Sequence, residues 1–175
     1  MNSQVKKDMS NSSAVFKNYI WDVIKTEGST LKMVEDFEEQ DSMRAKLDQL
    51  AGIDAWIIKP DGIIGIANRT QWSEKPWDSF TVRLKRDSGA DTECKKRIKA
   101  IFDSNELYLY PTITIQSYVT VTEGVIRVGS IKTKTLFDAI RRGRYKTNRT
   151  DNASFLYVDW DIFADNEISI FNINI

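Results

Sequence analysis

Apolar and polar positions alternate most clearly in the centre of the chain. Two apolar, β-branched runs, residues 53–59 and 63–72, lie on either side of Pro60-Asp61-Gly62, and Ser79–Arg86 alternates position by position. Alternation with a period of two is typical of strands, and Gly in a tight turn supplies a positive φ. The pattern predicts a hairpin that needs a positive φ at Gly62, followed by a third strand.

Apolar residues with helical spacing flank these strands. From Ala14 the spacing predicts a helix that ends near Gly28, and Ser29 or Thr30 is expected to cap a second helix reaching about Leu50. The other predicted elements are helices over 91–102 and 133–142 and strands over 111–121, 125–131, 155–160 and 168–173.

The order of these elements defines the expected fold class. Two helices, three strands, a helix, a strand pair, a helix and final strands predict an α+β fold, α/β-like, with helices packed on a central mixed β-sheet. The chain has 175 residues, of which 41% are hydrophobic, and about 70% of the unfolded surface of such a chain can be buried. We therefore expect a single domain over residues 13–175, preceded by a disordered, polar segment over residues 1–12.

The formal net charge is zero, but the charges are unevenly distributed along the sequence. Residues 27–54 hold eight acids and three bases, whereas residues 83–99 hold seven bases and three acids. Residues 127–149 hold eight bases and one acid. A basic middle can attract a polyanion such as nucleic acid, although a solvated charged surface explains the same pattern.

Histidine is absent, and Cys94 is the single cysteine. These counts exclude Ser-His-Asp and Cys-His triads, HExxH metal sites and a disulfide within the chain. Catalysis would have to use carboxylates, lysine, tyrosine or metal-bound water. Cys94 lies near the start of a predicted helix, which can lower the pKa of a thiol, but without a histidine we expect no catalytic cysteine.

The chain carries no sequence pattern of a membrane protein. No apolar run approaches the ~18–20 residues of a membrane span, and the first residues lack the apolar stretch of a signal peptide. We therefore expect a soluble, cytoplasmic protein without membrane contact.

Asp54, in the sequence GIDAW, lies at the start of a predicted strand. With the order of elements, it resembles the PD-(D/E)XK nuclease superfamily, the restriction-endonuclease-like fold. Members share a core of a helix, three strands, a second helix and a fourth strand. In that core an Asp on the second strand and an acid-x-Lys triplet on the third hold magnesium and activate water. The resemblance covers roughly residues 14–120 and implies that Asp54 is a metal ligand and Mg²⁺ the ion.

The acid-x-Lys triplet is missing where the resemblance places it, within residues 66–71. Arg69-x-Gln71 puts a cation at the position of the metal-binding acid. Mg²⁺ prefers carboxylates and water, so one Asp with these neighbours would bind it weakly. Either the site is degenerate and binds without cutting, or the second acid comes from elsewhere, with Glu93 on the crossover helix as a candidate beside Asp36, Glu38 and Glu39.

Aligning the strand alternations places polar side chains of neighbouring strands on one surface. Arg and Gln side chains there could donate to phosphates or bases. Asp54 could instead pair with Arg69 or Arg83 across the sheet, as an ordinary ion pair on a solvated face. The predicted surface consists of Asp54, Arg69, Gln71, Thr81, Arg83 and Lys85, extended by Glu93, Lys96 and Gln116.

A second basic run, RRGRYKTNR, follows the helix predicted over 133–142. Arg141, Arg142 and Arg144 are predicted to contact phosphates there, because each neutralised phosphate strengthens binding whatever the base sequence. Tyr145 could stack on a base. The same charges are equally compatible with a solvated surface.

Trp72 and Trp77 flank a polar loop at the edge of the predicted surface. If exposed, they could stack on a base or bind a protein partner, and packing beneath the loop is the simpler expectation. Trp21 and Trp56 lie on apolar faces and are expected in the core.

Two functions from different classes follow. The first is a metal-dependent nuclease-fold protein that binds or cleaves DNA or RNA with Mg²⁺, either active or catalytically degenerate, as a homodimer. Its predicted catalytic residues are Asp54, Arg69 and Gln71, its metal ligands Asp54 and Glu93, and its nucleic-acid contacts Arg83, Lys85, Lys96, Arg141, Arg142 and Arg144. The second is a non-enzymatic phage or mobile-element protein that inhibits a host protein. The acidic residues 27–54 and the missing triplet favour this alternative.

Overall fold

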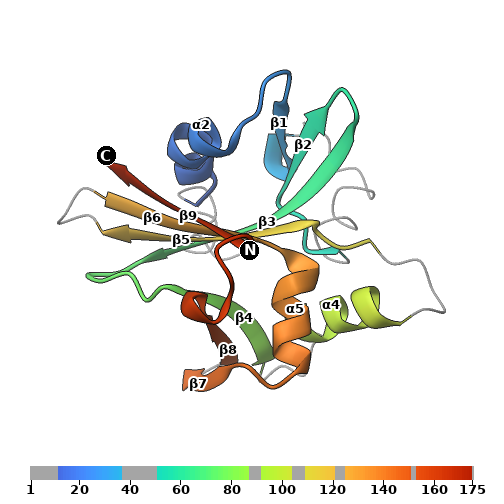
Figure 1. Cartoon of the computed structure of the whole chain (residues 1–175), viewed down its shortest axis with the longest axis vertical. Helices are drawn as coiled ribbons and strands as arrows, with labels where there is room; N and C mark the ends of the chain where they lie inside the picture. The colour runs from blue at the N-terminus through green and yellow to red at the C-terminus, as the bar shows by residue number, and fades with distance from the viewer. Residues whose placement is uncertain are drawn as a thin grey trace.

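Two β-sheets of unequal size form the framework of the protein (Figure 1). The computed structural model describes residues 12–36, 51–86, 92–103, 109–120, 125–150 and 153–174. The strands are β1 (Thr30–Met33), β2 (Ala55–Lys59), β3 (Gly62–Trp72), β4 (Ser79–Arg86), β5 (Ile113–Thr120), β6 (Val125–Lys132), β7 (Lys146–Thr150), β8 (Ala153–Asp159) and β9 (Ile168–Asn174). The large sheet has the order β1-β2-β3-β5-β6-β9, and the small sheet has the order β4-β8-β7.

Helical segments lie on both faces of the large sheet. They are η1 (Phe16–Ile20), a π-helical turn that continues into α2 (Trp21–Ile24), the 3-10 turns η2 (Val34–Asp36) and η4 (Trp160–Ile162), and the helices α4 (Glu93–Phe102) and α5 (Thr133–Arg141). Together with the mixed sheet they confirm the predicted α+β fold. None of the described helices is long and apolar enough to span a membrane.

Apolar side chains fill two cores, one on each face of the large sheet. In the upper core of Figure 1, Phe16 and Ile20 pack with strand residues such as Ile66. In the lower core, Leu136 of α5 packs with Phe80 of β4. Each fully buried side chain of this size stabilises the fold by about 1.5–3 kcal/mol. The large sheet is therefore the middle layer of three.

β2 and β3 form the predicted antiparallel hairpin, whose last pair is Lys59 and Gly62. The chain then leaves the large sheet through β4 and α4 and returns as β5, which pairs parallel to β3. Two parallel strands need a long crossover connection of this kind. The predicted positive φ of Gly62 is wrong. Pro60 and Asp61 make the turn, and Gly62 already belongs to β3 without a left-handed backbone.

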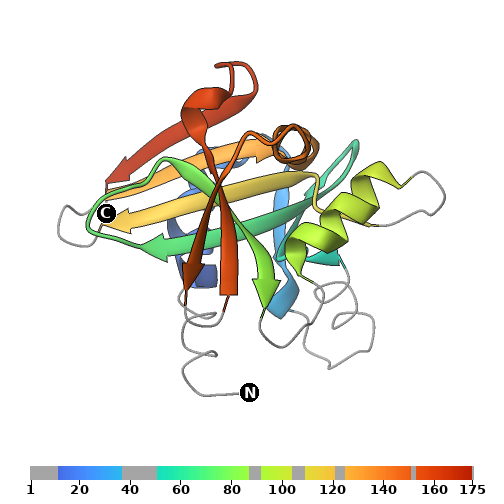
Figure 2. The same cartoon turned by 90° about the horizontal axis from the view of Figure 1, so that it is seen from below.

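The small sheet lies across the strands of the large sheet, and α5 covers one of its faces (Figure 2). Val82 of β4 lies opposite Leu156 of β8, and both belong to the lower core. Side chains alternate along a strand, so the neighbouring opposed pair, Arg83 and Phe155, points to the other face. We call this second face the outer face of the small sheet; the large sheet covers it at Thr81 and Phe155, and it is exposed at β7. Figure 1 shows β7 as the strand farthest from the large sheet.

The helix predicted from Ser29 or Thr30 to Leu50 is wrong over its described part. Residues 30–33 form β1, which pairs antiparallel with β2, and a 3-10 turn follows. Met33 is buried and Lys32 is exposed, so this short segment alternates as an edge strand does. Residues 37–50 lie outside the described residues, as does the segment predicted to be disordered, apart from Ser12, which is helical.

Five polar residues form β7, where the sequence predicts no strand. All five are exposed, so no apolar alternation marks the strand. β7 forms because its backbone pairs with β8, from Lys146 opposite Tyr157 to Thr150 opposite Ala153. The elements predicted over 91–102, 111–121, 125–131, 133–142, 155–160 and 168–173 are confirmed as α4, β5, β6, α5, β8 and β9.

Candidate nucleic-acid interface

Asp54 lies immediately before β2, beside the middle of β3. Its backbone N–H donates to the Ile66 carbonyl at 2.8 Å, and its Oδ2 accepts a hydrogen bond from the Asn68 backbone N–H at 2.6 Å. The pairing of β2 with β3 ends at Ala55 opposite Ile66, so the carboxylate takes the place of the next strand carbonyl. Asp54 therefore extends the sheet by one hydrogen bond and is held against β3.

Residues 66–71, within which the acid-x-Lys triplet is expected, pass beside Asp54, whose carboxylate contacts the Asn68 N–H. Ala55 and Ile66 lie opposite one another and belong to the upper core. Their neighbours Asp54 and Ala67 therefore point to the lower face of the sheet, as does Arg69 two positions later. Ala67 is buried and Arg69 is half-buried, so neither residue on this face supplies the second metal-binding acid.

Glu93, the other predicted metal ligand, forms an ion pair with Arg97 one turn later on α4. Arg97 is only 4% exposed, and its Nη2 donates to the Gly52 carbonyl at 3.1 Å. A buried guanidinium needs a counter-charge, and Glu93 supplies it here. Among the described residues, no three of Asp, Glu, Cys or His gather into a group that could hold a metal ion.

Gln71, Gln116 and Thr81 are predicted on one polar surface, and the structure brings them together between the two sheets. Gln71 Oε1 accepts hydrogen bonds from Gln116 Nε2 at 3.0 Å and from the Thr81 hydroxyl at 3.2 Å. The Thr81 backbone N–H donates to Gln116 Oε1 at 3.3 Å. A buried amide without partners is destabilising, so this network both satisfies Gln116 and fastens β4 to β3 and β5.

Arg69 of β3 and Arg83 of β4 meet at the ring of Phe155 in β8. Their Cζ atoms lie 5.0 Å and 5.6 Å from the ring centroid. The electron-rich faces of an aromatic ring attract guanidinium groups and can hold two like charges near one another. Phe155 is 9% exposed and both arginines are half-buried. Arg69 from the large sheet and Arg83 from the small sheet therefore place two positive charges close together where the two sheets meet.

The other two basic residues predicted on this surface, Lys85 and Lys96, lie elsewhere on the fold. A β-bulge between Arg83 and Lys85 shifts the register, so Lys85 lies opposite Ser154 and the alternation predicted for residues 79–86 is interrupted there. Lys96 is a half-buried residue of α4.

The second basic run forms the end of α5, a turn and β7. Gly143, with a φ of 75°, ends the helix, and its N–H donates to the Ile140 carbonyl at 2.9 Å. The chain then reverses into β7, and all residues from 141 to 150 are exposed. We call the cationic residues of this stretch the basic segment: Arg141, Arg142, Arg144, Lys146 and Arg149.

Contacts with the body of the protein position part of the basic segment. The Arg141 guanidinium lies 4.9 Å from the centre of the Phe102 ring at the end of α4. Arg144 Nη2 donates to the Ile162 carbonyl at 3.1 Å. The basic segment is therefore anchored to ordered elements at two points while its side chains remain in contact with solvent.

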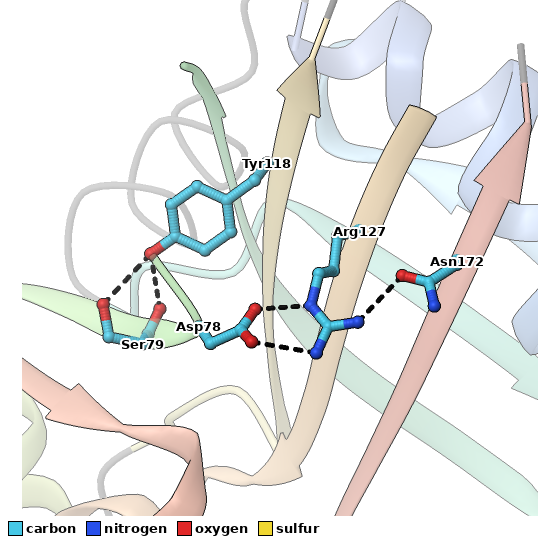
Figure 3. A network of polar contacts seen from close by, with 5 residues as sticks. All are labelled: Asp78, Ser79, Tyr118, Arg127 and Asn172. Atoms are coloured by element: carbon cyan, nitrogen blue, oxygen red, sulfur yellow. Dashed lines mark hydrogen bonds and ion pairs between the residues drawn. The ribbon is translucent and has the colours of Figure 1, made fainter. Parts of the chain in front are cut away.

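A polar network that the sequence does not predict joins the start of β4 to the large sheet (Figure 3). The Asp78 carboxylate accepts hydrogen bonds from Arg127 Nε at 2.5 Å and Nη2 at 2.8 Å, and Arg127 Nη1 donates to Asn172 Oδ1 at 2.9 Å. The Tyr118 hydroxyl donates to the Ser79 carbonyl at 2.7 Å. Asp78 has a φ of 48°, so its contact with Arg127 holds a residue with a left-handed backbone.

These contacts shift the pKa values of two members of the network. The hydrogen bonds with Asp78 raise the pKa of Arg127. Burial raises the pKa of Tyr118, and hydrogen bonds with Ser79 and Thr81 partly offset that rise. The partners lie in separate strands and one loop, so neither spacing nor periodicity identifies them in the sequence.

Cys94 and the loop tryptophans differ from the predictions. Burial raises the pKa of the Cys94 thiol to about 11, and Glu93 adds to the rise, so the predicted lowering is wrong.

Trp72 and Trp77 are 45% and 55% exposed, so the loop does not bury them. Trp77 lies against Tyr157 of β8, with 5.9 Å between the ring centroids.

The predicted site residues thus separate into an inner group and an outer group. Gln71 and Gln116 serve the contact between the sheets, Arg69 and Arg83 lie at its edge, and the basic segment lies on the surface. No family model, no curated protein and no solved structure matches this chain.

Proposed function

We propose that this protein is a nuclease-fold protein that binds DNA or RNA through the basic segment. The observation that carries the proposal is the uninterrupted exposure of residues 141–150, which include five cationic side chains and no acid. Arg141 ends α5, Arg142 and Arg144 lie in the turn that follows, and Lys146 and Arg149 lie on β7, so ordered elements flank the segment on both sides. A phosphate backbone is the polyanion that such a surface fits.

Two features of the basic segment favour phosphate contacts over an internal role. Arg142 and Arg149 form no ion pair within the described part of the chain, so binding a phosphate would not require them to leave one. Arg141 and Arg144 are oriented by Phe102 and by a backbone carbonyl, which lowers the entropy lost on binding.

In chain order the elements are α2, β1, β2, β3, β4, α4 and β5, and β4 belongs to the small sheet. The strands β1, β2, β3 and β5 of the large sheet, with α4 and with Asp54 held against Asn68, support the nuclease-like core. Ala67 and Arg69 on the face of Asp54, and the pairing of Glu93 with Arg97, favour a degenerate site. We therefore propose that the protein holds nucleic acid without cutting it. The carboxylate of Asp54, without further acids gathered beside it in the described residues, does not fit a Mg²⁺ site.

Fluorescence anisotropy with labelled DNA and RNA tests the binding proposal. The triple variant Arg141→Gln/Arg142→Gln/Arg144→Gln removes three positive charges and is expected to weaken binding at least tenfold at low salt. It is also expected to reduce the slope of log K against log salt by about 2. The matched control Lys25→Gln/Lys32→Gln/Lys59→Gln removes the same charge near α2, β1 and β2, at the opposite end of Figure 1 from β7. We expect the control to bind like the unaltered protein.

Equal losses in the two triple variants would reject the basic segment as the binding site. If the unaltered protein binds neither DNA nor RNA at low salt, the proposal fails and the protein-partner alternative gains weight. A parallel incubation with plasmid DNA and single-stranded RNA, with Mg²⁺, Mn²⁺ or chelator, tests the degenerate site. Metal-dependent cutting that disappears in Asp54→Ala would show an active nuclease and contradict the proposal of binding alone.

A further inference from the structure

The outer face of the small sheet carries aromatic and cationic side chains in two adjacent rows. The register places Thr81 of β4, Tyr157 of β8 and Lys146 of β7 in one row. The next row along the strands holds Arg83, Phe155 and Asn148. Each row therefore has an aromatic ring on the central strand, but Phe155 and Thr81 are buried beside the large sheet, so Tyr157 is the ring of the two rows that solvent reaches.

Trp77 extends this pattern from the loop before β4. Its ring is tilted by 39° against that of Tyr157, and it is 55% exposed. Tyr157 is half-buried, so one part of its ring contacts protein and another part contacts solvent. Trp77 and Tyr157 together present an aromatic surface that a flat ligand can reach.

Charges of both signs lie near these two rings, because Lys146 lies within electrostatic range of the exposed Asp161 as well as of Asp159. Lys146, which lies opposite Tyr157, pairs with Asp159 at 2.5 Å, so the acid on this face is compensated. Arg83 and Arg69 lie against Phe155 in the neighbouring row. The basic segment continues the positive charge beyond the edge of the sheet.

Resting on the proposed function, we infer that this face binds single-stranded nucleic acid, with bases stacked on Trp77 and Tyr157. In a duplex the bases stack on each other and their faces are not available to side chains. Exposed aromatic rings beside cations suit unpaired bases, whose faces stack on the rings while the phosphates contact the charges. A surface for duplex DNA needs only the cations.

The test compares a fluorescein-labelled oligo-dT of about 12 nucleotides with a duplex of the same length, a span within the usual range for such sites. The variant Trp77→Ala/Tyr157→Thr removes both rings, and Thr keeps a strand-forming residue on β8. We expect about a tenfold loss of affinity for the single strand and less than a twofold change for the duplex. Trp72→Ala is the matched control, because Trp72 is also exposed but lies in the alternation of β3 on the face opposite Arg69 and Gln71.

A folding defect in the double variant is separated from a binding defect by two further measurements. Trp77→Phe keeps an aromatic ring and is expected to restore most of the single-strand affinity. In the Trp72→Phe background, oligo-dT is expected to quench the tryptophan emission, because Trp77 is then the only exposed tryptophan among the described residues.

The outcomes distinguish this inference from the proposed function. Unchanged affinity of the double variant for the single strand, or equal losses for single strand and duplex, would overturn the inference while binding through the basic segment stands. Absence of binding to either nucleic acid by the unaltered protein would reject both.

Discussion

The two edges of the small sheet differ in what holds them. In β4, Phe80 and Val82 lie in the lower core, and Thr81 is hydrogen-bonded to the large sheet. In β7, at the opposite edge, all five side chains are exposed. Polar residues at the β4 edge are used to join two sheets, whereas polar residues at the β7 edge remain available to a ligand. The polar residues of β7 are therefore better candidates for binding a ligand than the polar residues of β4, which stabilise the contact between the sheets.

The largest effect is expected from Gly129→Ala in β6, because Gly129 contacts Trp160, which packs against Phe80 of β4. A Cβ atom at Gly129 would overlap the ring of Trp160, which is buried against Phe80 and Tyr118 and cannot move away. Overpacking of this kind typically destabilises by about 1–3 kcal/mol, and we expect the upper part of that range. Urea denaturation followed by far-UV circular dichroism measures the change.

Gly62→Ala is the matched control for this substitution. Gly62 also lies in a strand, its φ is not positive, and a Cβ there would meet no atom within 4 Å. We expect Gly62→Ala to be neutral or slightly stabilising. Equal destabilisation by the two alanines would contradict the role assigned to Trp160.

Tyr118→Phe removes the hydroxyl that joins β5 to the start of β4. The Ser79 carbonyl then loses its donor in a buried place, and we expect a loss of about 1–2 kcal/mol in the free energy of unfolding. Tyr145→Phe removes an exposed hydroxyl and is the control. The same denaturation curves at pH 8 measure both.

The raised pKa of Tyr118 adds a pH dependence to this comparison. An unfolded tyrosine ionises near pH 10, whereas the folded protein keeps the Tyr118 proton to higher pH. The folded state then binds more protons than the unfolded state, so this contribution to stability is complete below about pH 10 and is lost as the pH rises towards the folded pKa. The difference in stability between the unaltered protein and Tyr118→Phe should therefore shrink between pH 9 and pH 11. A difference that stays constant would contradict the burial of this hydroxyl.

A smaller effect is expected from breaking the contact of Asp78 with Arg127. Both side chains are partly exposed, so Arg127→Gln should lower the free energy of unfolding by about 1 kcal/mol, and less at high salt. Asp78→Gly and Asp78→Ala both lose the ion pair, but only glycine accepts a φ of 48° without strain. Equal stability of the Gly and Ala variants would count against the left-handed backbone at this residue.

The smallest effect on stability is expected at the β7 edge. Arg149 is exposed, so Arg149→Gln should change the free energy of unfolding by less than about 0.5 kcal/mol. The same variant should weaken nucleic-acid binding, because one phosphate contact is removed. A clear loss of stability in this variant would show that the two edges are more alike than their exposure indicates.

The strands with apolar alternation are the part of the fold that the sequence predicts well. The β2–β3 hairpin follows from two β-branched runs around a Pro-Asp turn, and α5 follows from its helical spacing. β7 has no apolar position, and β1 has four residues, so neither carries enough periodicity to be recognised. Pairing with a neighbour that is distant in sequence forms these strands, and a local pattern does not contain that information.

The candidate site is predicted in part for the same reason. Gln71 and Gln116 are predicted on one polar surface from strand alternation, and in the structure they form a hydrogen bond. The meeting of Arg69 and Arg83 at Phe155 depends on how the two sheets cross, which the sequence pattern does not reveal. Burial of Arg97 with Glu93 likewise depends on packing, so the sequence alone presents Glu93 as a free acid.

The pairing of β4 with β8 has a consequence for the way the molecule assembles. Phe80 and Val82 lie beside residues of β8 that follow the whole of α4, β5, β6, α5 and β7 in the chain. Contacts between segments so distant in sequence close slowly, and until then the apolar side chains of β4 are without their native sheet. During synthesis β4 therefore cannot pair with β8 until residues 153–159 have been added to the chain. The outer face that we propose for unpaired bases exists only after that late step, so an incomplete chain would lack it.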